Sequence, residues 1–293
     1  MMDAKTEFSG EKADVREAVE RYLEEQFAAY AETEVRRAAE YTALGGGHRW
    51  RPIVAIAAGR IFHTDALEIA LPGACGAELA HAASLILDDL PSMDDAALRR
   101  GKPCVHLVFP KWAVDMAPVF LVTMAYAISL NHDRSSADRR VQAALALSSA
   151  GTAMIEGQCL DLASSLADGT EAQMLDCYRL KSAALYGAAA RGGALLCGAG
   201  PEDADRMERA GFYLGLAYQF MDDVADVTAT VEQVGKQVHQ DDGKFTATAW
   251  LGVEGAAEMS RSYQTKALAE LAPYGPEAEW LRSIVCEASW ATH

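Results

Sequence analysis

Long stretches of helix-forming residues follow one another along almost the whole chain. Ala, Leu, Glu and Arg dominate them, and apolar residues recur every three or four positions, for example over 11–40, 139–166 and 202–227. The strict alternation of apolar and polar residues that a half-buried strand needs is missing, and so are Asn-Gly hairpin turns. The sequence therefore predicts an all-α bundle of about ten or more helices.

Gly and Pro residues indicate where these helices begin and end. The Gly-rich segment 42–51 separates the first helix from a second, and Pro52 suits the first turn of that second helix. Pro72 and Gly73 are expected to end it, so that a new helix covers 74–88. Further helices are predicted over 118–130 and 171–199, and a polar loop is predicted over 231–244.

The length and composition favour one large domain. The chain has 293 residues, of which 51% are hydrophobic, so it can bury a substantial core. No Pro-, Gly- or Ser-rich linker, low-complexity run or repeat interrupts it. We therefore expect a single domain over 1–293, with its motif-bearing part at about 45–252.

The formal net charge of −16 limits the partners. Nucleic acid and anionic lipid surfaces attract proteins rich in Lys and Arg, so neither is an expected partner. The first segment of the chain is charged and lacks the apolar region of a signal peptide. The longest apolar run, about 117–130, is shorter than a membrane helix, and the cysteines form no CxxC pair. We expect a cytoplasmic protein with no stable membrane insertion.

Two clusters of aspartates stand out, because each lies at the C-terminal end of a strongly apolar helix. The first contains Asp88, Asp89 and Asp94, and the second contains Asp222, Asp223 and Asp226. The dipole at a helix C-terminus already favours cations, so carboxylates in that place need a compensating positive charge. Clustered oxygen ligands favour Mg²⁺, which proteins usually bind through one or two carboxylates plus substrate phosphates.

The spacing within each cluster supports a shared metal site. Asp222 and Asp226 are four residues apart and so lie on one helical face. Pro91 must distort the turn after Asp88, which could bring Asp94 round beside it. One such cluster could be a solvated helix end. Two clusters in one apolar helical chain favour opposed faces that hold several Mg²⁺ ions around one diphosphate.

These motifs resemble those of trans-isoprenyl diphosphate synthases, the polyprenyl synthetase family. The family's DDxxxxD motif matches Asp88, Asp89 and Asp94, and its DDxxD motif matches Asp222, Asp223 and Asp226. The segments 81–89 and 235–244 are most similar to bacterial geranylgeranyl diphosphate synthases. The resemblance implies helices around a central apolar cavity, a homodimer, and Mg²⁺ as the cofactor, with about three ions per active site.

The resemblance also implies the reaction and its substrates. Isopentenyl diphosphate is joined to an allylic diphosphate, such as dimethylallyl, geranyl or farnesyl diphosphate. The allylic diphosphate group leaves, the double bond of isopentenyl diphosphate attacks the carbocation, and a proton is then lost. Apolar helix walls would exclude the water that quenches such a cation. The residues assigned to catalysis are Asp88, Asp89, Asp94, Asp222, Asp223, Asp226 and Lys181, and all of these except Asp223 and Lys181 are predicted metal ligands.

Basic residues occupy the positions of the family's diphosphate sites. The Gly-rich segment 45–52 resembles GGKRxRP, which assigns isopentenyl diphosphate to Arg49 and Arg51 and places His48 where the family has lysine. A histidine is only partly charged at neutral pH, so this departure bears on the affinity for isopentenyl diphosphate. The other substrate-binding residues implied by the resemblance are His81, Arg99, Arg100, Lys181, Ser182, Gln219, Lys236 and Lys244.

Small residues just before the first cluster indicate how long the product grows. The tail should run beside the helix that ends at Asp88, and Ala83 lies about 7.5 Å deeper at the helical rise. A bulky aromatic there would form a floor, as in farnesyl-type members of the family. Because Ala83 and Ser84 are small, we predict that the tail passes and that the product is geranylgeranyl diphosphate, with a C20 tail.

Three alternatives stay open. The product could be farnesyl diphosphate or have another chain length. A class I terpene cyclase also uses an aspartate-rich helix and Mg²⁺, but it pairs this with an Asn/Ser/Glu motif. Asn131 and Ser135 have that spacing, whereas Arg139 stands in place of the acid. A non-catalytic synthase subunit would usually lose one aspartate cluster, and this chain retains both.

Overall fold

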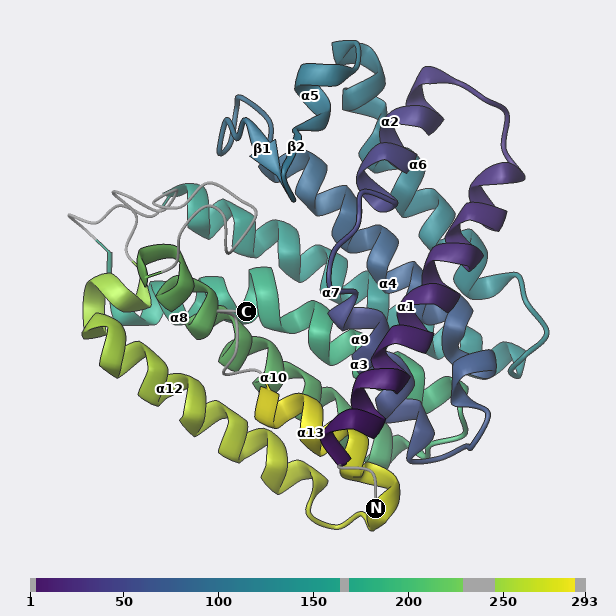
Figure 1. Ribbon diagram of the computed structural model, residues 1–293, viewed down its shortest axis with the longest axis vertical. Coiled ribbons are helices and arrows are strands. Elements are labelled where there is room, and N and C mark those ends of the chain that lie inside the picture. Colours follow the sequence, from purple (N-terminus) through teal and green to yellow (C-terminus); the bar gives the residue numbers. More distant parts are fainter. Residues whose placement is uncertain (1–3, 164–168, 229–245, 288–293) are drawn as a thin grey trace.

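The computed structural model describes residues 4–163, 169–228 and 246–287, and these parts form an almost entirely helical bundle (Figure 1). The helices are α1 (Ala4–Ala28), α2 (Glu34–Ala43), α3 (Trp50–Arg60), α4 (Ala66–Asp88), α5 (Val105–Val108), α6 (Lys111–Leu130), α7 (Ala137–Ala163), α8 (Glu171–Cys177), α9 (Ala184–Leu196), α10 (Pro201–Thr228), α12 (Ala247–Leu271) and α13 (Glu279–Glu287). Two short helices and a two-stranded hairpin complete the fold: the π-helix η1 (Tyr178–Ala183), the 3₁₀-helix η2 (Pro276–Ala278), β1 (Leu98–Arg99) and β2 (Lys102–Pro103). The predicted all-α fold is confirmed.

One cluster of buried apolar side chains draws on helices from α1 to α13. The most extensive contacts join α10 to α12 and α9, α4 to α6, and α3 to α9. Helices of this length are stabilised mainly by burying long apolar faces against one another, which these contacts do. The C-terminal end of α4 leads into the β1–β2 hairpin at one end of the bundle, and α12 lies along one side beside α10 (Figure 1).

The predicted helix over 11–40 is divided in the structure. The first helix ends at Ala28, and Thr33 then caps α2 by accepting a hydrogen bond from the backbone amide of Arg36 at 3.1 Å. A threonine at this position satisfies one of the amide groups that a helix start leaves without a partner. The Ala-, Glu- and Arg-rich composition concealed this break, because it favours a helix on both sides.

The prediction that Pro72 and Gly73 end a helix is wrong, because α4 continues through both. Pro72 has no amide hydrogen for the carbonyl oxygen of Glu68, one turn earlier. That oxygen instead accepts a hydrogen bond from the Arg134 side chain at 3.4 Å. Pro72 is buried, so apolar packing and this substitute partner hold the turn. Helix α6 likewise begins before its predicted start and contains Pro118.

The predicted helix over 171–199 contains a local change of geometry. After α8, η1 adopts the wider π-helical form before α9 begins. Such single-turn π segments are frequent at functional sites. The segment 98–103 is a tight hairpin with Arg100 and Gly101 in the left-handed region, at φ 53° and 73°.

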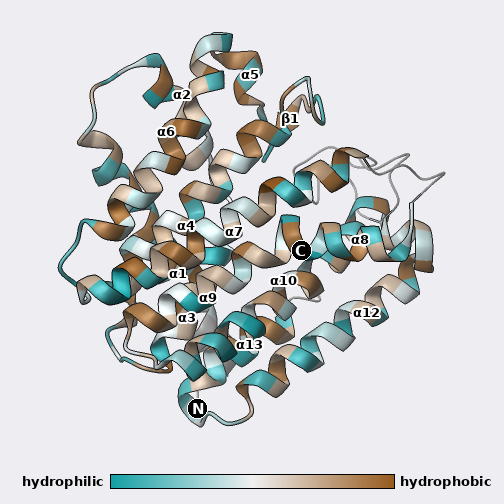
Figure 2. Ribbon diagram, turned by 180° about the vertical axis from the view of Figure 1, so that it is seen from behind, coloured by the Kyte–Doolittle hydropathy of each residue, from teal (hydrophilic) through white to brown (hydrophobic). Residues whose placement is uncertain are grey.

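Helices α4 and α6 are long and apolar enough to cross a membrane, judged by length and composition alone. In the structure, 67% of the apolar segment of α4 and 50% of that of α6 is buried inside the protein. A helix in the core of a large bundle has the same composition as a membrane span. Hydrophobic residues also continue along the outward side of α6 (Figure 2).

Candidate active site

The first aspartate cluster lies where α4 ends. Asp88 is the last residue of α4, and the chain then folds back so that the amide of Asp94 donates to the carbonyl oxygen of Asp88 at 3.0 Å. Asp95 closes the turn with φ 47° and donates to Leu90 at 3.1 Å. The turn at Pro91 therefore brings Asp94 back to Asp88, as the sequence predicted.

The carboxyl group of Asp88 lies in surroundings that disfavour its charged form. Burial raises its pKa to about 6, and the neighbouring Asp94 adds to the rise, while Lys181 and Arg99 oppose it. A carboxyl group in this state is stabilised in its charged form by a nearby cation. The environment of Asp88 therefore fits a site that receives a divalent cation, and it shows that Lys181 is close enough to act on the first cluster.

Asp89, a predicted metal ligand, is paired with an arginine in the structure. It is 3% exposed, and both carboxylate oxygens accept hydrogen bonds from Arg99 Nε, at 3.0 and 3.1 Å. The Cys104 thiol also contacts this carboxylate. Burial, and then the charge of Asp89, raise the pKa of the thiol to about 12. Asp89 thus holds Arg99, from β1, against the end of α4. In this arrangement it positions a cation.

The second cluster occupies the last two turns of α10. Asp223 is 3% exposed and accepts hydrogen bonds from Gln219 at 3.0 Å, from the backbone of Ala247 at 2.9 Å, and from the Tyr178 hydroxyl. These contacts fasten α10 to η1 and to the start of α12. Asp222 and Asp226 are partly exposed and buried respectively, one turn apart. Asp223 is therefore the structural member of this cluster, and the other two carboxylates share a helical face.

Lys181 and Ser182 stand on η1, between the two clusters. Lys181 Nζ lies 2.7 Å from Asp161 on α7, and Ser182 donates to Gln219 on α10 at 2.5 Å. Gly157 lets α7 approach this segment, because a Cβ at that position would lie only 2.3 Å from the backbone nitrogen of Lys181. The predicted allylic-site residues of η1 and α10 are thus brought together.

A second group of cations lies between the Gly-rich loop, α4 and the hairpin. The Arg51 guanidinium stacks on the Tyr186 ring at 4.8 Å from its centroid, and no group in the described part of the chain bonds its buried Nε. Burial lowers the pKa of His81 well below its ordinary value, and the charges of Arg51 and Arg100 lower it further. Burial likewise raises the pKa of Tyr218 to about 12, a rise that Asp222 strengthens and Arg51 opposes. These effects place the cations within electrostatic reach of the second cluster.

The Gly-rich loop is locked to the hairpin by Arg100. The Arg100 side chain donates to the carbonyl oxygen of Gly46. A Cβ at Gly47 would lie 2.5 Å from the Arg100 guanidinium carbon, and the φ of 120° there also favours glycine. The pKa of the neighbouring His48 is lowered, first by burial and then by the charges of Arg16 and Arg100. Both effects favour the neutral form of His48.

The predicted role of Arg49 in binding isopentenyl diphosphate does not fit its position. Arg49 is 2% exposed, and its guanidinium donates to Glu20 at 2.8 Å, to Glu78 at 2.8 Å and to the carbonyl oxygen of Ala43 at 2.7 Å. Every nitrogen of the guanidinium therefore has a protein partner. Arg49 instead ties α1, the end of α2 and α4 together behind the Gly-rich loop. An acidic residue in the middle of a largely apolar helix, Glu78, was the available sequence signal for this buried pair.

The remaining predicted residues divide into three groups. Ala83 is 3% exposed and packs in the core, and the Ser84 hydroxyl donates to the carbonyl oxygen of His81 at 2.9 Å. Lys236 and Lys244 lie outside the described residues. Ser135, from the cyclase alternative, donates to Leu196 at the far end of α9 from Lys181, so that motif does not join the site.

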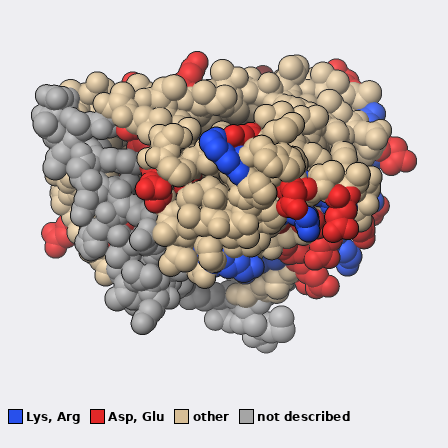
Figure 3. All heavy atoms as spheres, turned by 90° about the horizontal axis from the view of Figure 1, so that it is seen from above, with Lys and Arg blue, Asp and Glu red and all other residues tan. Residues whose placement is uncertain are grey.

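The acids do not form a ready-made metal cage. Within residues 4–163, 169–228 and 246–287, no three acidic, His or Cys side chains converge closely enough to hold a metal ion by themselves. Mg²⁺ is commonly bound through one or two carboxylates together with substrate phosphates, and this arrangement fits that mode. Seen from the hairpin end, basic side chains emerge near the centre of the face beside acidic ones (Figure 3).

Comparison with known proteins gives one consistent family. The polyprenyl synthetase family model matches residues 32–276. The chain is 37% identical over 247 residues to geranylgeranyl pyrophosphate synthase 6, mitochondrial, of Arabidopsis thaliana, covering 80% of this chain and 73% of that one. It is 32% identical over 245 residues to the farnesyl diphosphate synthase of Bacillus subtilis, covering 80% and 82%. A geranyltransferase from Helicobacter pylori, solved with magnesium and isoprenyl diphosphate, superimposes with a TM-score of 0.80 at 26% identity, covering 94% and 95%.

Proposed function

The chain belongs to the polyprenyl synthetase family, and from this premise we propose that it condenses isopentenyl diphosphate with allylic diphosphates to give geranylgeranyl diphosphate. The observation that carries the proposal is the gathering of both aspartate clusters and two groups of cations at one end of an apolar bundle. Anionic substrates need the cations, and a hydrocarbon tail needs the apolar helices.

Mg²⁺ fits the residues of this site. Asp88 and Asp94 on one side, with Asp222 and Asp226 on the other, would hold the ions. The raised pKa of Asp88 supports this assignment, because a nearby cation would stabilise the charged carboxylate. When bound, Mg²⁺ would stabilise the negative charge that develops on the leaving diphosphate. The number of about three ions per site stays a prediction.

The cations of the chain divide between the two substrates. Lys181, held by Asp161, and Arg99, held by Asp89, flank the end of α4 and would bind the allylic diphosphate. Arg51, whose Nε has no partner among the described residues, lies with Arg100 near His81 and would bind isopentenyl diphosphate. The substrate charges are thereby fixed on either side of the place where the new carbon–carbon bond forms.

Once the substrates are bound, the condensation reaction needs few further protein groups. Departure of the allylic diphosphate leaves a carbocation, and the double bond of isopentenyl diphosphate attacks it to form the new bond. Loss of a proton to the released diphosphate restores a double bond. The apolar helices exclude water, which would otherwise capture the cation.

We also propose a homodimer formed through the outer faces of α6 and α7. Trp112, Met116 and Val119 recur at helical spacing on α6 and are 56%, 55% and 65% exposed. Leu145 and Ile155 on α7 are 61% and 67% exposed. Exposed apolar faces of this kind on neighbouring helices are typical of a subunit interface. Sedimentation should give twice the chain mass, and Val119→Asp should give the mass of a single chain.

The location of the protein in the cell is a further part of the proposal. A net charge of −16 opposes binding to anionic lipid, and α4 is mainly a core helix. We therefore expect a cytoplasmic enzyme without stable membrane insertion. Fractionation of cells that contain the native protein should recover it in the supernatant, and recovery with washed membranes would contradict this expectation.

Product analysis tests the proposed reaction. The purified protein is incubated with Mg²⁺, isopentenyl diphosphate and either dimethylallyl, geranyl or farnesyl diphosphate, and the products are separated by chromatography. We expect a linear C20 diphosphate from each primer. A C15 product would revise the chain length, a cyclic hydrocarbon would indicate a cyclase, and no turnover with any primer would indicate a non-catalytic subunit.

A further inference from the structure

Helix α1 contacts the Gly-rich loop and the start of α3 through three side chains that lie one turn apart. The contacts join Lys12 to the Trp50 ring, Arg16 to the carbonyl oxygen of His48, and Glu20 to Arg49. Because residues four apart on a helix share one face, α1 presents a single face to the loop. That face carries two cations and one acid.

Arg16 is the cation of this face that no carboxylate neutralises among the described residues. Lys12, one turn earlier, pairs with Glu287 of α13, and Glu20, one turn later, pairs with a loop arginine at 2.6 Å. Arg16 Nε donates to the carbonyl oxygen of His48 at 3.1 Å. In the described part of the chain, the two terminal nitrogens of Arg16 have no hydrogen-bond partner. The backbone contact therefore holds the guanidinium at the loop and leaves these nitrogens for a ligand.

The loop beside Arg16 is accessible to such a ligand. Gly47 and His48 are exposed, and Arg16 is half-buried. The pKa of His48 is lowered first by burial, and then by the charge of Arg16 and by that of Arg100 from the hairpin. Two guanidinium groups from different parts of the fold are therefore within electrostatic reach of one exposed loop.

The cations around this loop favour an anionic ligand. Arg49 is paired with two carboxylates of its own, and burial favours the neutral form of His48. Arg16, Arg51 and Arg100 remain, and their like charges repel one another unless an anion binds beside them. A diphosphate group carries several negative charges, and its oxygens accept paired hydrogen bonds from a guanidinium group.

We propose that Arg16 of α1 binds the diphosphate group of isopentenyl diphosphate together with Arg51 and Arg100. This inference rests on the proposed function and adds a substrate-binding residue from outside the motif-bearing part of the chain, 45–252. The bond from Nε to the loop orients the guanidinium, and the two terminal nitrogens donate to phosphate oxygens. Helix α1 thereby supplies a positive charge that His48 does not provide.

Binding measurements test the inference without requiring turnover. Isopentenyl diphosphate is titrated into the protein in a calorimeter, with Mg²⁺ and a non-reactive allylic diphosphate analogue present. Arg16→Gln should raise the dissociation constant by about tenfold, which corresponds to about 1.4 kcal/mol for one charge-assisted contact. Arg16→Lys, which keeps the charge, should stay within about threefold of the wild type. Arg21→Gln is the matched control, because Arg21 is exposed on the same helix.

Steady-state kinetics separate substrate binding from a merely structural role of Arg16. With geranyl diphosphate and Mg²⁺, Arg16→Gln should raise the KM for isopentenyl diphosphate by about tenfold. Its kcat and its KM for geranyl diphosphate should change by at most about twofold. The double variant Arg16→Gln/His48→Lys should recover most of the lost affinity, because the lysine returns a positive charge to the same loop. A charge at position 48 would not repair a loop that had only lost its structure.

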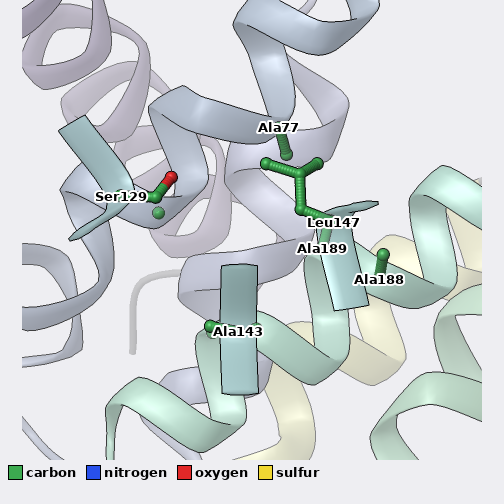
Figure 4. A pocket seen from close by; sticks show the side chains of 9 residues that line it. Ala77, Ser129, Ala143, Leu147, Ala188 and Ala189 are labelled. Carbon is green, nitrogen blue, oxygen red and sulfur yellow. The ribbon is translucent and has the colours of Figure 1, made fainter. Parts of the chain in front are cut away.

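A core variant controls for a general loss of stability. Leu147 on α7 is 6% exposed, and its side chain extends toward Ala77 beside a small internal cavity (Figure 4). Leu147→Ala should lower the melting temperature, because it enlarges a cavity in the core, and should leave the dissociation constant for isopentenyl diphosphate unchanged. Arg16→Gln should weaken binding while its melting temperature stays near that of the wild type. Arg16→Met takes its place if Arg16→Gln does not fold.

The outcomes distinguish this inference from the proposed function. If the wild-type protein forms no prenyl diphosphate but Arg16→Gln weakens its binding of isopentenyl diphosphate, the proposed function fails and the inference stands. If the wild-type protein is active and Arg16→Gln binds isopentenyl diphosphate equally well, the inference is overturned. An equal loss in Arg21→Gln, a double variant that binds no more tightly than Arg16→Gln, or a wild type that does not bind isopentenyl diphosphate would also overturn it.

Discussion

Lys181 lies on the π-helical segment η1, between the two aspartate clusters, and its Nζ is 2.7 Å from Asp161 Oδ2 on α7. The pair is largely but not completely buried, with side chains 26% and 16% exposed. Asp161 therefore holds the one described lysine that acts electrostatically on Asp88. The relationship gives Asp161 a positioning role for Lys181.

Replacing Asp161 with asparagine should affect one substrate more than the other. The change removes the charged partner of Lys181, so we expect the KM for the allylic diphosphate to rise by about 5–10-fold, with a smaller change for isopentenyl diphosphate. Asp176→Asn is the matched control, because it removes an exposed pair with Arg179 on the neighbouring helix. Equal changes in both KM values would argue against a positioning role for Asp161.

Two glycines on α7 provide a test of the backbone contact behind Lys181. A Cβ at Gly157 would lie 2.3 Å from the Lys181 nitrogen, whereas a Cβ at Gly151 meets nothing within 4 Å. We expect Gly157→Ala to lower kcat/KM by about 100-fold through displacement of the lysine. Gly151→Ala should raise the free energy of unfolding by about 0.5–1 kcal/mol and keep activity. Similar kinetics for the two variants would show that the close approach is unimportant.

Arg49 should behave as a structural residue. Removing one partner of a buried ion pair leaves the other charge unpaired, so Arg49→Met should lower the free energy of unfolding by about 3–5 kcal/mol. The double variant Arg49→Met/Glu78→Met should recover part of this loss. Arg37→Met, at a half-exposed pair with Glu34, should change stability by at most about 0.5 kcal/mol. A stable Arg49→Met protein with a raised KM for isopentenyl diphosphate would restore the original prediction.

His48 should contribute little charge at neutral pH. Its folded-state pKa is lowered below the ordinary value, first by burial and then by Arg16 and Arg100. The folded protein therefore holds its proton less tightly than the unfolded chain, so the stability contributed by neutral His48 is present above about pH 6.5 and is lost as the pH falls. Thermal melts of the wild type and His48→Gln should diverge only on the acid side.

A lysine at position 48 should strengthen one binding step. It would add a full positive charge near the Gly-rich loop, so His48→Lys should lower the KM for isopentenyl diphosphate by about 3–10-fold at pH 7.5. His48→Gln, which is neutral, should match the wild type at that pH. An equal KM in the lysine variant would show that position 48 does not face the diphosphate.

The sequence was sufficient to predict most of the fold. Apolar periodicity and helix-forming composition located α7 and α10 closely, because their long apolar faces are what the core requires. It failed at Pro72, where the carbonyl oxygen of Glu68 finds a distant partner in Arg134. It also missed η1, which has no local composition of its own and whose backbone lies close to Gly157 of α7.

The site was predictable in its chemistry and less so in its geometry. Residue type and spacing identified both clusters, and the resemblance to the family identified most of the cations. They could not distinguish Arg49 from Arg51. Arg49 forms a buried pair with Glu78 and Arg51 stacks on Tyr186, and this difference depends on the left-handed backbone at Arg49. They also could not separate Asp89, which holds Arg99, from Asp88 beside it.

Crystals grown with Mn²⁺ in place of Mg²⁺ and a non-reactive allylic diphosphate analogue would test the central claim most directly. Anomalous scattering locates each manganese ion without reference to the protein model. The account predicts manganese between the end of α4 and the end of α10, with Asp88 or Asp94 and Asp222 or Asp226 as ligands around one diphosphate. Manganese at only one cluster, or a diphosphate bound away from both, would contradict it.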